Sequence, residues 1–189
     1  PDTLERLCSV YNECKRIGEV PPEWKSAMVK MLYKKSVHDD PAGTADVAKY
    51  RGISLSSCVG KVLEAVMYVR MARHIEEVWK LHDLQNGFRK GRNSITHGFL
   101  LSELLNHRSS NSIQLYWDLQ SAFPAMRRSS GLRALYDAAV VGDMWRLVRA
   151  FYSGTESKVA VGGSFSEPYA VTNGVKEGSL VSPLVFILL

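Results

Sequence analysis

An aspartate at the end of an apolar run, with an aromatic residue close behind it, is the first pattern in this sequence that suggests chemistry. Asp118 follows Ile113-Gln114-Leu115-Tyr116-Trp117, and Phe123 stands five positions later. The apolar run predicts a β-strand over residues 112–118. A carboxylate at the end of such a strand is placed to hold a divalent metal ion through oxygen ligands.

A second stretch changes from polar to apolar between Gly174 and Phe186. Gly174 and Gly178 bracket a short turn in which a backbone without Cβ atoms can approach a ligand closely. Ser182 and Pro183 then predict the start of a helix, with Ser182 as its N-cap and Pro183 in the first turn. Exposed amides at this helix start are predicted to hold phosphate.

Together these stretches resemble two motifs of the reverse transcriptases of non-LTR (LINE-like) retrotransposons. Asp118…Ala122-Phe123 resembles motif A, and Gly174-Val175-Lys176-Glu177-Gly178…Ser182-Pro183…Phe186 resembles motif B. Three upstream segments are similar to the same family, namely Pro22-Glu23-Trp24-Lys25, Tyr50-Arg51-Gly52-Ile53-Ser54-Leu55 and Gln85-Asn86-Gly87-Phe88-Arg89-Lys90-Gly91-Arg92. The resemblance covers nearly the whole chain, with the motifs in the family's order.

The resemblance implies an α+β fold of the right-hand fingers and palm type, with helices around a small antiparallel sheet. It divides the chain into a fingers-like region, residues 1–110, and a partial palm, residues 111–189, that holds both motifs. The implied activity is RNA-directed DNA polymerisation, which copies an RNA template from a DNA primer with deoxynucleoside triphosphates. The oligomeric state stays open.

The resemblance also implies the metal chemistry and its ligands. Nucleotidyl transfer uses two divalent ions, here magnesium, to activate the primer hydroxyl and to neutralise the triphosphate. Asp118 is the expected catalytic residue and metal ligand, with the Leu119 carbonyl as a second ligand; as a lone pattern, an Asp after a strand is more often a structural cap.

Further substrate contacts follow from the same resemblance. Phe123 is expected under the sugar of the nucleotide, although a core Phe is the plain alternative. The expected pocket and triphosphate residues are Gly174, Glu177, Gly178, Arg51 and Lys61. The Gly-punctuated basic loop supplies three candidates for nucleic-acid binding, Arg89, Lys90 and Arg92.

Three positions depart from the family pattern. Pro124 stands where the family usually has Asp, Glu177 where it has Gln, and Gly52 where it has Pro. The family's next motif, an aromatic-x-Asp-Asp hairpin with further metal ligands, does not occur in these residues. Because one carboxylate cannot hold both ions, residues 1–189 on their own are expected to be inactive. The alternative functions are a decayed or repurposed nucleic-acid-binding protein without catalysis, and a helical interaction domain.

Hydrophobic periodicity predicts the helices and strands that must position these residues. Val59, Val62, Leu63, Val66 and Val69 predict the core face of a helix over about 59–79. Residues 27–33 alternate as a strand, and Gly162-Gly163-Ser164 predicts a hairpin that leads into residue 174. Further helices are predicted from Ile95, from Ser129 or Ser130, and over 144–151.

Composition sets broad limits on the protein. With 46% hydrophobic and 23% charged residues, the chain has a globular composition, and general disorder is excluded. The net charge of +5 and the pI near 9.2 favour a polyanionic partner. Five arginines between 127 and 149 fit either phosphate contact or a solvated face. Gly60-Lys61 lacks the flanking residues of a nucleotide-binding P-loop.

Cysteine use and hydropathy bear on the compartment. The three cysteines have no metal-ligand spacing and predict reduced thiols, typical of an intracellular protein. No apolar run reaches membrane-spanning length, so no membrane contact is expected. Family resemblance refines the expected location to a nuclear or cytoplasmic ribonucleoprotein.

Overall fold

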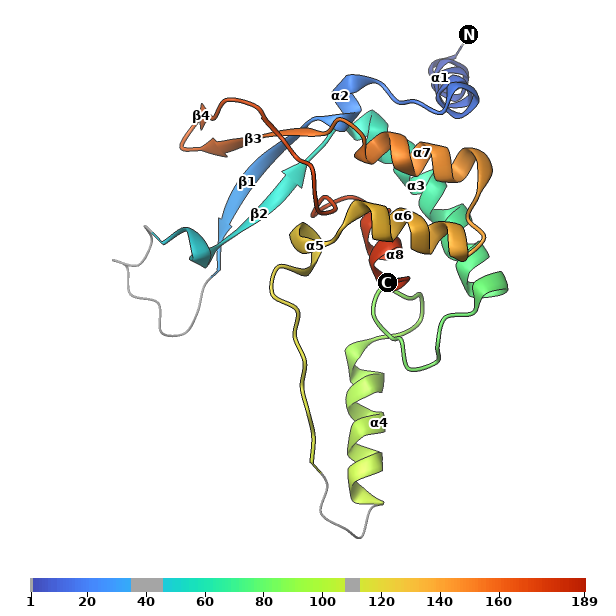
Figure 1. The fold of residues 1–189 in the computed structure, drawn as a ribbon, viewed down its shortest axis with the longest axis vertical. Helices are drawn as coiled ribbons and strands as arrows, with labels where there is room; N and C mark the ends of the chain where they lie inside the picture. The colour runs from blue at the N-terminus through green and yellow to red at the C-terminus, as the bar shows by residue number, and fades with distance from the viewer. Residues whose placement is uncertain (1, 35–45, 108–112) are drawn as a thin grey trace.

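The computed structural model describes residues 2–34, 46–107 and 113–189 (Figure 1). The helices are α1 (Thr3–Ile17), α2 (Pro22–Lys25), α3 (Cys58–His74), α4 (Ser94–Asn106), α5 (Ala122–Ala125), α6 (Arg128–Asp137), α7 (Gly142–Tyr152) and α8 (Ser182–Ile187). The strands are β1 (Ala27–Tyr33), β2 (Tyr50–Leu55), β3 (Glu156–Val161), β4 (Ser164–Phe165) and β5 (Tyr169–Ala170). A 3-10 turn, Val47–Lys49, precedes β2, and a π-helical turn, Ile75–Trp79, extends α3.

The strands form one small sheet in the order β2-β1-β3-β4, with β5 also paired to β3. β1 pairs antiparallel with β2, from Met28 opposite Leu55 to Tyr33 opposite Tyr50. β1 pairs parallel with β3, whereas β3 pairs antiparallel with both β4 and β5. The predicted α+β class is confirmed, but the sheet is mixed rather than antiparallel. The parallel pair arises because more than a hundred residues, helices included, separate β1 from β3, which leaves room for a crossover.

The sheet joins the two predicted regions of the chain. β1 belongs to the fingers-like region and β3 to the palm-like region, yet the two strands are hydrogen-bonded neighbours. The boundary predicted near residue 110 lies outside the described residues and stays a prediction.

Helix α3 confirms the predicted helix but not its predicted core face. Its first turn is capped by the Ser57 side chain, which accepts from the Gly60 amide at 3.4 Å. The valines of the predicted stripe are exposed, Val69 to 64%. Leu63 of the predicted stripe is buried, and Gly60, Glu64, Met67 and Met71 complete the buried face. Gly60 packs under the Trp24 ring, where a Cβ would lie 3.1 Å from the indole, and this contact turns the valine face outward.

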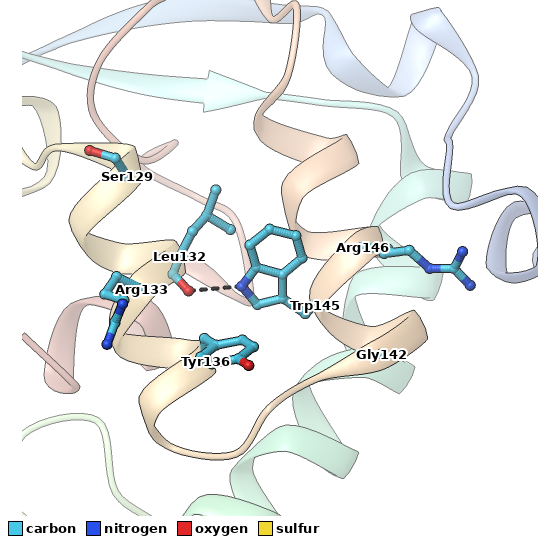
Figure 2. A pocket seen from close by; sticks show the side chains of 7 residues that line it. All are labelled: Ser129, Leu132, Arg133, Tyr136, Gly142, Trp145 and Arg146. Carbon is cyan, nitrogen blue, oxygen red and sulfur yellow. Dashed lines mark hydrogen bonds between the residues drawn. The ribbon is translucent and has the colours of Figure 1, made fainter.

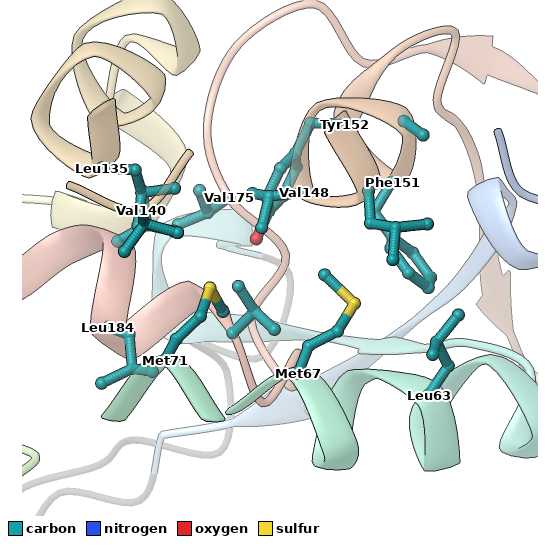
Figure 3. Packing of buried hydrophobic residues seen from close by; sticks show 14 of the residues in the cluster. Leu63, Met67, Met71, Leu135, Val140, Val148, Phe151, Tyr152, Val175 and Leu184 are labelled. Carbon is teal, nitrogen blue, oxygen red and sulfur yellow. The ribbon is translucent and has the colours of Figure 1, made fainter. Parts of the chain in front are cut away.

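The hydrophobic core lies between α3, α6, α7 and α8. Figure 3 shows Leu63, Met67 and Met71 of α3 pointing toward Val148 and Phe151 of α7. Leu135, Val175 and Leu184 bring α6, the loop before α8 and α8 itself into the same cluster. Residues 174–186 therefore pack on this core.

The strand predicted over residues 112–118 is wrong for the residues that the structure describes. Residues 113–119 have no regular secondary structure and run as a single segment into α5 (Figure 1). Their large side chains are exposed, Trp117 to 91%. A strand is stable only when its amides pair with a neighbour, and no described strand lies beside this segment.

The helices predicted from Ile95, from Ser129 or Ser130 and over 144–151 are confirmed, as is the predicted hairpin. α4 begins at Ser94 behind an Asn93 cap, whose side chain accepts from the Thr96 amide at 2.9 Å. α6, α7 and the strands β3, β4 and β5 occur where periodicity and glycines placed them. Cys8, Cys14 and Cys58 are free thiols. Within the described residues, no helix combines the length and apolar character that a bilayer crossing requires.

Candidate functional site

The loop of residues 174–178, called here the motif B loop, is bonded directly to the segment that contains Phe123. The Gly174 amide donates to the Met126 carbonyl at 2.8 Å, and the Val175 amide donates to the Phe123 carbonyl at 3.0 Å. Two segments that are about fifty residues apart in the sequence are thus joined through their backbones. The structure brings these parts of the two motifs together as the resemblance implies.

Gly174 is required by this contact. Its φ is +77°, and a Cβ would lie 2.5 Å from the Pro124 carbonyl oxygen. Pro124 itself occupies the first turn of the short helix α5, where amide groups have no partner within the helix. A proline is therefore accommodated there without loss of a helical hydrogen bond.

The other end of the motif B loop rests on β2. The Ser54 amide donates to the Glu177 carbonyl at 2.9 Å. Gly178 has a φ of +110°, and a Cβ there would lie 2.9 Å from the Ser54 carbonyl oxygen. The loop is consequently clamped between α5 on one side and β2 on the other, with glycine at both points of closest approach.

Lys176 points away from the solvent and into the protein. Its ammonium group donates to the Lys25 carbonyl at 3.0 Å and to the Trp24 carbonyl at 3.3 Å, at the end of α2. Burial lowers the pKa of Lys176, because desolvation disfavours the charged amine. These bonds tie the middle of the loop to the segment before β1.

The start of α8 differs from its predicted chemistry. Val181 is the N-cap, and the buried Ser182 hydroxyl donates to the Lys176 carbonyl at 3.0 Å instead of capping the helix. The Leu180 amide donates to the buried carboxylate of Glu64 at 3.0 Å. Glu64 thus occupies the Leu180 amide, just before the helix, whereas the predicted phosphate at the amides of the first turn stays a prediction. Pro183 does lie in the first turn, as predicted.

Phe123 lies at the junction of three segments. Its ring stacks on Phe186 of α8 with centroids 5.1 Å apart, and meets Phe88 edge-on at 6.0 Å. Phe123 is only partly buried. This position is compatible with a sugar contact as well as with a packing role.

Asp118 and Leu119 lie on the exposed segment before α5. Within residues 2–34, 46–107 and 113–189, no three His, Cys, Asp or Glu side chains gather as a metal site. The donor set at 118 and 119 consists of one carboxylate and one backbone carbonyl. Such hard oxygen donors fit magnesium, but they supply only part of a coordination shell.

Arg51 and Lys61 both lie in the fingers-like region, on β2 and α3. Side chains alternate along β2, so Arg51 and Ile53 lie on one face of the sheet and Gly52 and Ser54 on the other. A cavity of about 240 Å³ lies on the Gly52 and Ser54 face, behind the motif B loop. Arg51 therefore faces away from this cavity. Lys61 lies in the first turn of α3 and is partly buried.

The basic loop of residues 85–92 binds largely to its own chain. Arg89 is 8% exposed, pairs with Glu76 at 2.6 Å and donates to the carbonyls of His82 and Gln85. Arg92 pairs with Asp83 at 3.2 Å. Lys90 is exposed and leaves its charge available at the surface. The structure thus gives Arg89 a role in holding the loop against the end of α3.

A larger cavity lies elsewhere. It measures about 600 Å³ and is formed by α6 and α7, with Leu132, Tyr136 and Trp145 along its wall (Figure 2). The Trp145 indole donates to the Leu132 carbonyl at 2.8 Å, which links the two helices. None of the predicted site residues lines it. We place the candidate site at the motif B loop, because the segment that contains Phe123 is hydrogen-bonded to Gly174 and Val175 there.

Sequence reasoning missed the side chains that support this loop from beneath. Glu64 binds the Leu180 amide, Arg128 binds the Gly174 carbonyl at 2.8 Å, and Tyr152 bonds to the Ser182 hydroxyl at 2.8 Å. The sequence did contain a signal for Glu64, because it is a charged residue between Leu63 and Met67 on an otherwise apolar helix face. Nothing in the sequence separated Arg128 from the neighbouring arginines.

The comparisons with known proteins agree with this geometry. The family described as reverse transcriptase (RNA-dependent DNA polymerase) matches residues 33–189. A 115 kDa protein in the type-1 retrotransposable element R1DM of Drosophila melanogaster is 30% identical over 191 residues, which cover 98% of this chain and 17% of that protein. The RNA-directed DNA polymerase from mobile element jockey of Drosophila melanogaster is 26% identical over 98% of this chain and 20% of its own length.

A Pol polyprotein from the type-1 retrotransposable element R2 of Popillia japonica is 23% identical over 89% of this chain and 23% of its own length. The chain thus spans about a fifth of the length of these relatives. The relatives confirm the resemblance to polymerases of non-LTR retrotransposons, and the match of 33–189 to the family covers most of the sequence. The chain therefore belongs to the reverse transcriptase (RNA-dependent DNA polymerase) family.

Proposed function

We propose that this chain forms the nucleotide-binding part of an RNA-directed DNA polymerase of a non-LTR retrotransposon. The observation that carries the proposal is the backbone junction between the motif B loop and the Phe123 segment. A pocket for an incoming nucleotide needs a fixed backbone beside the residue that meets the sugar. Gly174 and Val175 supply that backbone next to Phe123.

Within this proposal, Asp118 and the Leu119 carbonyl hold magnesium together with ligands from outside these residues. Magnesium held there would supply positive charge that neutralises the triphosphate and activates the primer hydroxyl. Asp118 is exposed. An exposed carboxylate leaves its oxygens accessible to a metal ion, and magnesium prefers oxygen ligands.

Phe123 is proposed to lie under the sugar, and Arg51 and Lys61 to contact the triphosphate. Arg offers a fork that bonds two phosphate oxygens, whereas Lys acts as a point charge. Glu177 lines the pocket as an acceptor only, because an ionised carboxylate has no proton to donate. Its negative charge opposes the triphosphate, and this departure from Gln weakens nucleotide binding relative to the family pattern.

The proposed partners are an RNA template, a DNA primer and deoxynucleoside triphosphates, in a nuclear or cytoplasmic ribonucleoprotein. The net charge of +5 supports a polyanionic partner. Arg51, Lys61, Lys90 and Arg92 are the proposed contacts with phosphate. Arg89 remains a weaker candidate because its guanidinium is already bound to Glu76.

Binding of an RNA–DNA template–primer by residues 1–189 should depend steeply on salt. About four phosphate contacts give a log–log slope near −3, so affinity should fall roughly 60-fold between 50 and 200 mM salt. Filter binding across this range measures the slope. The Lys61→Gln, Lys90→Gln double variant should make the slope shallower by about 1.5, whereas Lys15→Gln on α1, an exposed lysine near Asp143, should leave it unchanged. Absence of binding, or binding without a slope, contradicts the proposed contacts.

A second candidate function is a repurposed protein that binds nucleic acid without catalysis. Pro124 and Glu177, which depart from the family pattern, favour it. However, α5 accommodates Pro124 in its first turn, so Pro124 is weaker evidence for this second function. Primer extension by a polymerase that contains this chain separates the two candidates, since both predict binding and only the first predicts synthesis.

A further inference from the structure

Arg128 joins three segments that meet behind the motif B loop. Its Nε donates to the Gly174 carbonyl at 2.8 Å, at the first residue of the loop. Its Nη1 donates to the Tyr152 carbonyl at 2.6 Å and to the Thr155 hydroxyl at 2.8 Å, at the end of α7 and just before β3. One side chain thus fixes the loop relative to the sheet and the core.

The placement of Arg128 is unusual for a charged residue. Among the described residues, no acidic side chain forms an ion pair with it, and its Nη2 is buried without a hydrogen-bond acceptor. Burial lowers the pKa of Arg128 because the charged form is desolvated. A neutral residue would fill this space at lower cost. A neutral residue, however, would lack the planar guanidinium group, which donates to carbonyls in different segments at once.

Tyr152 helps to fix the middle of the motif B loop, at Lys176. The Arg128 guanidinium lies over the Tyr152 ring, 5.5 Å from its centroid. The Ser182 hydroxyl has one proton, which it donates to the Lys176 carbonyl at 3.0 Å. The Tyr152 hydroxyl must therefore be the donor in its 2.8 Å bond to Ser182. Burial raises the pKa of Tyr152 to about 12, so this proton stays in place at neutral pH.

We propose that Arg128 is a positioning residue that sets the affinity for the incoming nucleotide by fixing the Gly174 carbonyl, with Tyr152 holding the Lys176 carbonyl through Ser182. The inference rests on the proposed function and adds residues that no motif of the family resemblance contained. Arg128 makes no contact with nucleotide in this account. It acts through the backbone of the loop.

In a polymerase that contains this chain, Arg128→Lys should raise KM for deoxynucleoside triphosphates about tenfold and leave kcat within about twofold. Lysine keeps the charge, but its single nitrogen cannot reach all three acceptors. Tyr152→Phe, which removes only the hydroxyl, should raise KM about threefold. Arg133→Lys is the matched control on the same helix, because Arg133 is exposed and, among the described residues, pairs with Asp137 of its own helix. Steady-state kinetics with a saturating template–primer separates KM from kcat.

Hydrogen exchange on residues 1–189 gives an independent measurement. Arg128→Lys should speed exchange of the Gly174 and Val175 amides at least tenfold, with amides in α3 unchanged. Unchanged KM and unchanged exchange in both Arg128→Lys and Tyr152→Phe overturn the inference. Absence of extension by the unsubstituted polymerase instead counts against the proposed function, while loop exchange still decides the role of Arg128. If Arg128→Lys loses protection from hydrogen exchange throughout the chain, Arg128 has a general role in folding, and the inference is also overturned.

Discussion

Replacing Asp118 with asparagine should reduce RNA-templated primer extension by about 10³-fold or more in a polymerase that contains this chain. Loss of one group that stabilises developing charge costs about 10² to 10³ in kcat in other active sites, and removal of a charged metal ligand should cost at least as much. The substitution keeps size and shape, and Asp118 is exposed, so the fold should be unaffected.

The matched control is Asp137→Asn. Asp137 is also an aspartate at the surface, but it pairs with Arg133 within α6 and lies outside the proposed pocket. Single-turnover extension with both variants isolates the chemical step. Retention of full activity in Asp118→Asn would remove Asp118 from the metal site.

Gly174→Ala should destabilise the protein by about 3 kcal/mol or more. A positive φ costs a non-glycine residue about 1 kcal/mol, and the new Cβ would lie 2.5 Å from a backbone oxygen that cannot easily move. Backbone strain and a core clash together belong to the larger class of mutational effects. For a chain of this length, Tm should fall by roughly 10 °C.

Gly163→Ala is the control that separates the cost of backbone strain from the cost of the steric clash. Gly163 has a similar φ of +84°, and nothing lies within 4 Å of the added Cβ. This control should lose only about 1 kcal/mol. Urea denaturation of both variants gives the two free energies. Equal losses would show that Gly174 does not pack closely on the Pro124 backbone, and the junction between the two motifs would then lose its main support.

Local signals in the sequence predicted the elements around the site well. Gly174, Gly178 and Pro183 fixed a turn followed by a helix, because each restricts or frees the backbone at its own position. The helix predicted over about 59–79 followed from helical periodicity and corresponds to α3 with its π-helical turn. These features depend on short-range conformational preference, which a sequence displays directly.

Two predictions failed because they depended on partners distant in the sequence. The apolar run before Asp118 has strand composition, but no described strand pairs with it, and an unpaired strand has unsatisfied amides. The valines and methionines of α3 are both apolar, so hydrophobicity alone could not choose the buried face. The contact of Gly60 with Trp24 and the bond from Leu180 to Glu64 made that choice.

The candidate site was predictable in part. The family resemblance placed Phe123 and Gly174 in one pocket, and the hydrogen bonds between their segments agree with it. The roles of Arg128 and Tyr152 could not be predicted, because both depend on which carbonyls the fold brings within reach. Arg133 and Arg128 have the same chemistry in the sequence, yet only Arg128 begins α6 next to the motif B loop.

The central claim is that Phe123 and the motif B loop form one nucleotide pocket, and photocrosslinking tests it most directly. A deoxynucleoside triphosphate with a photoreactive base would be irradiated with the polymerase containing this chain, on an RNA–DNA template–primer with magnesium. Mass spectrometry then identifies the labelled peptides. We expect label on the peptides that contain Phe123 and residues 174–178, and competition by the complementary unmodified nucleotide. Label confined to the cavity between α6 and α7, at Leu132 or Trp145, would contradict the account.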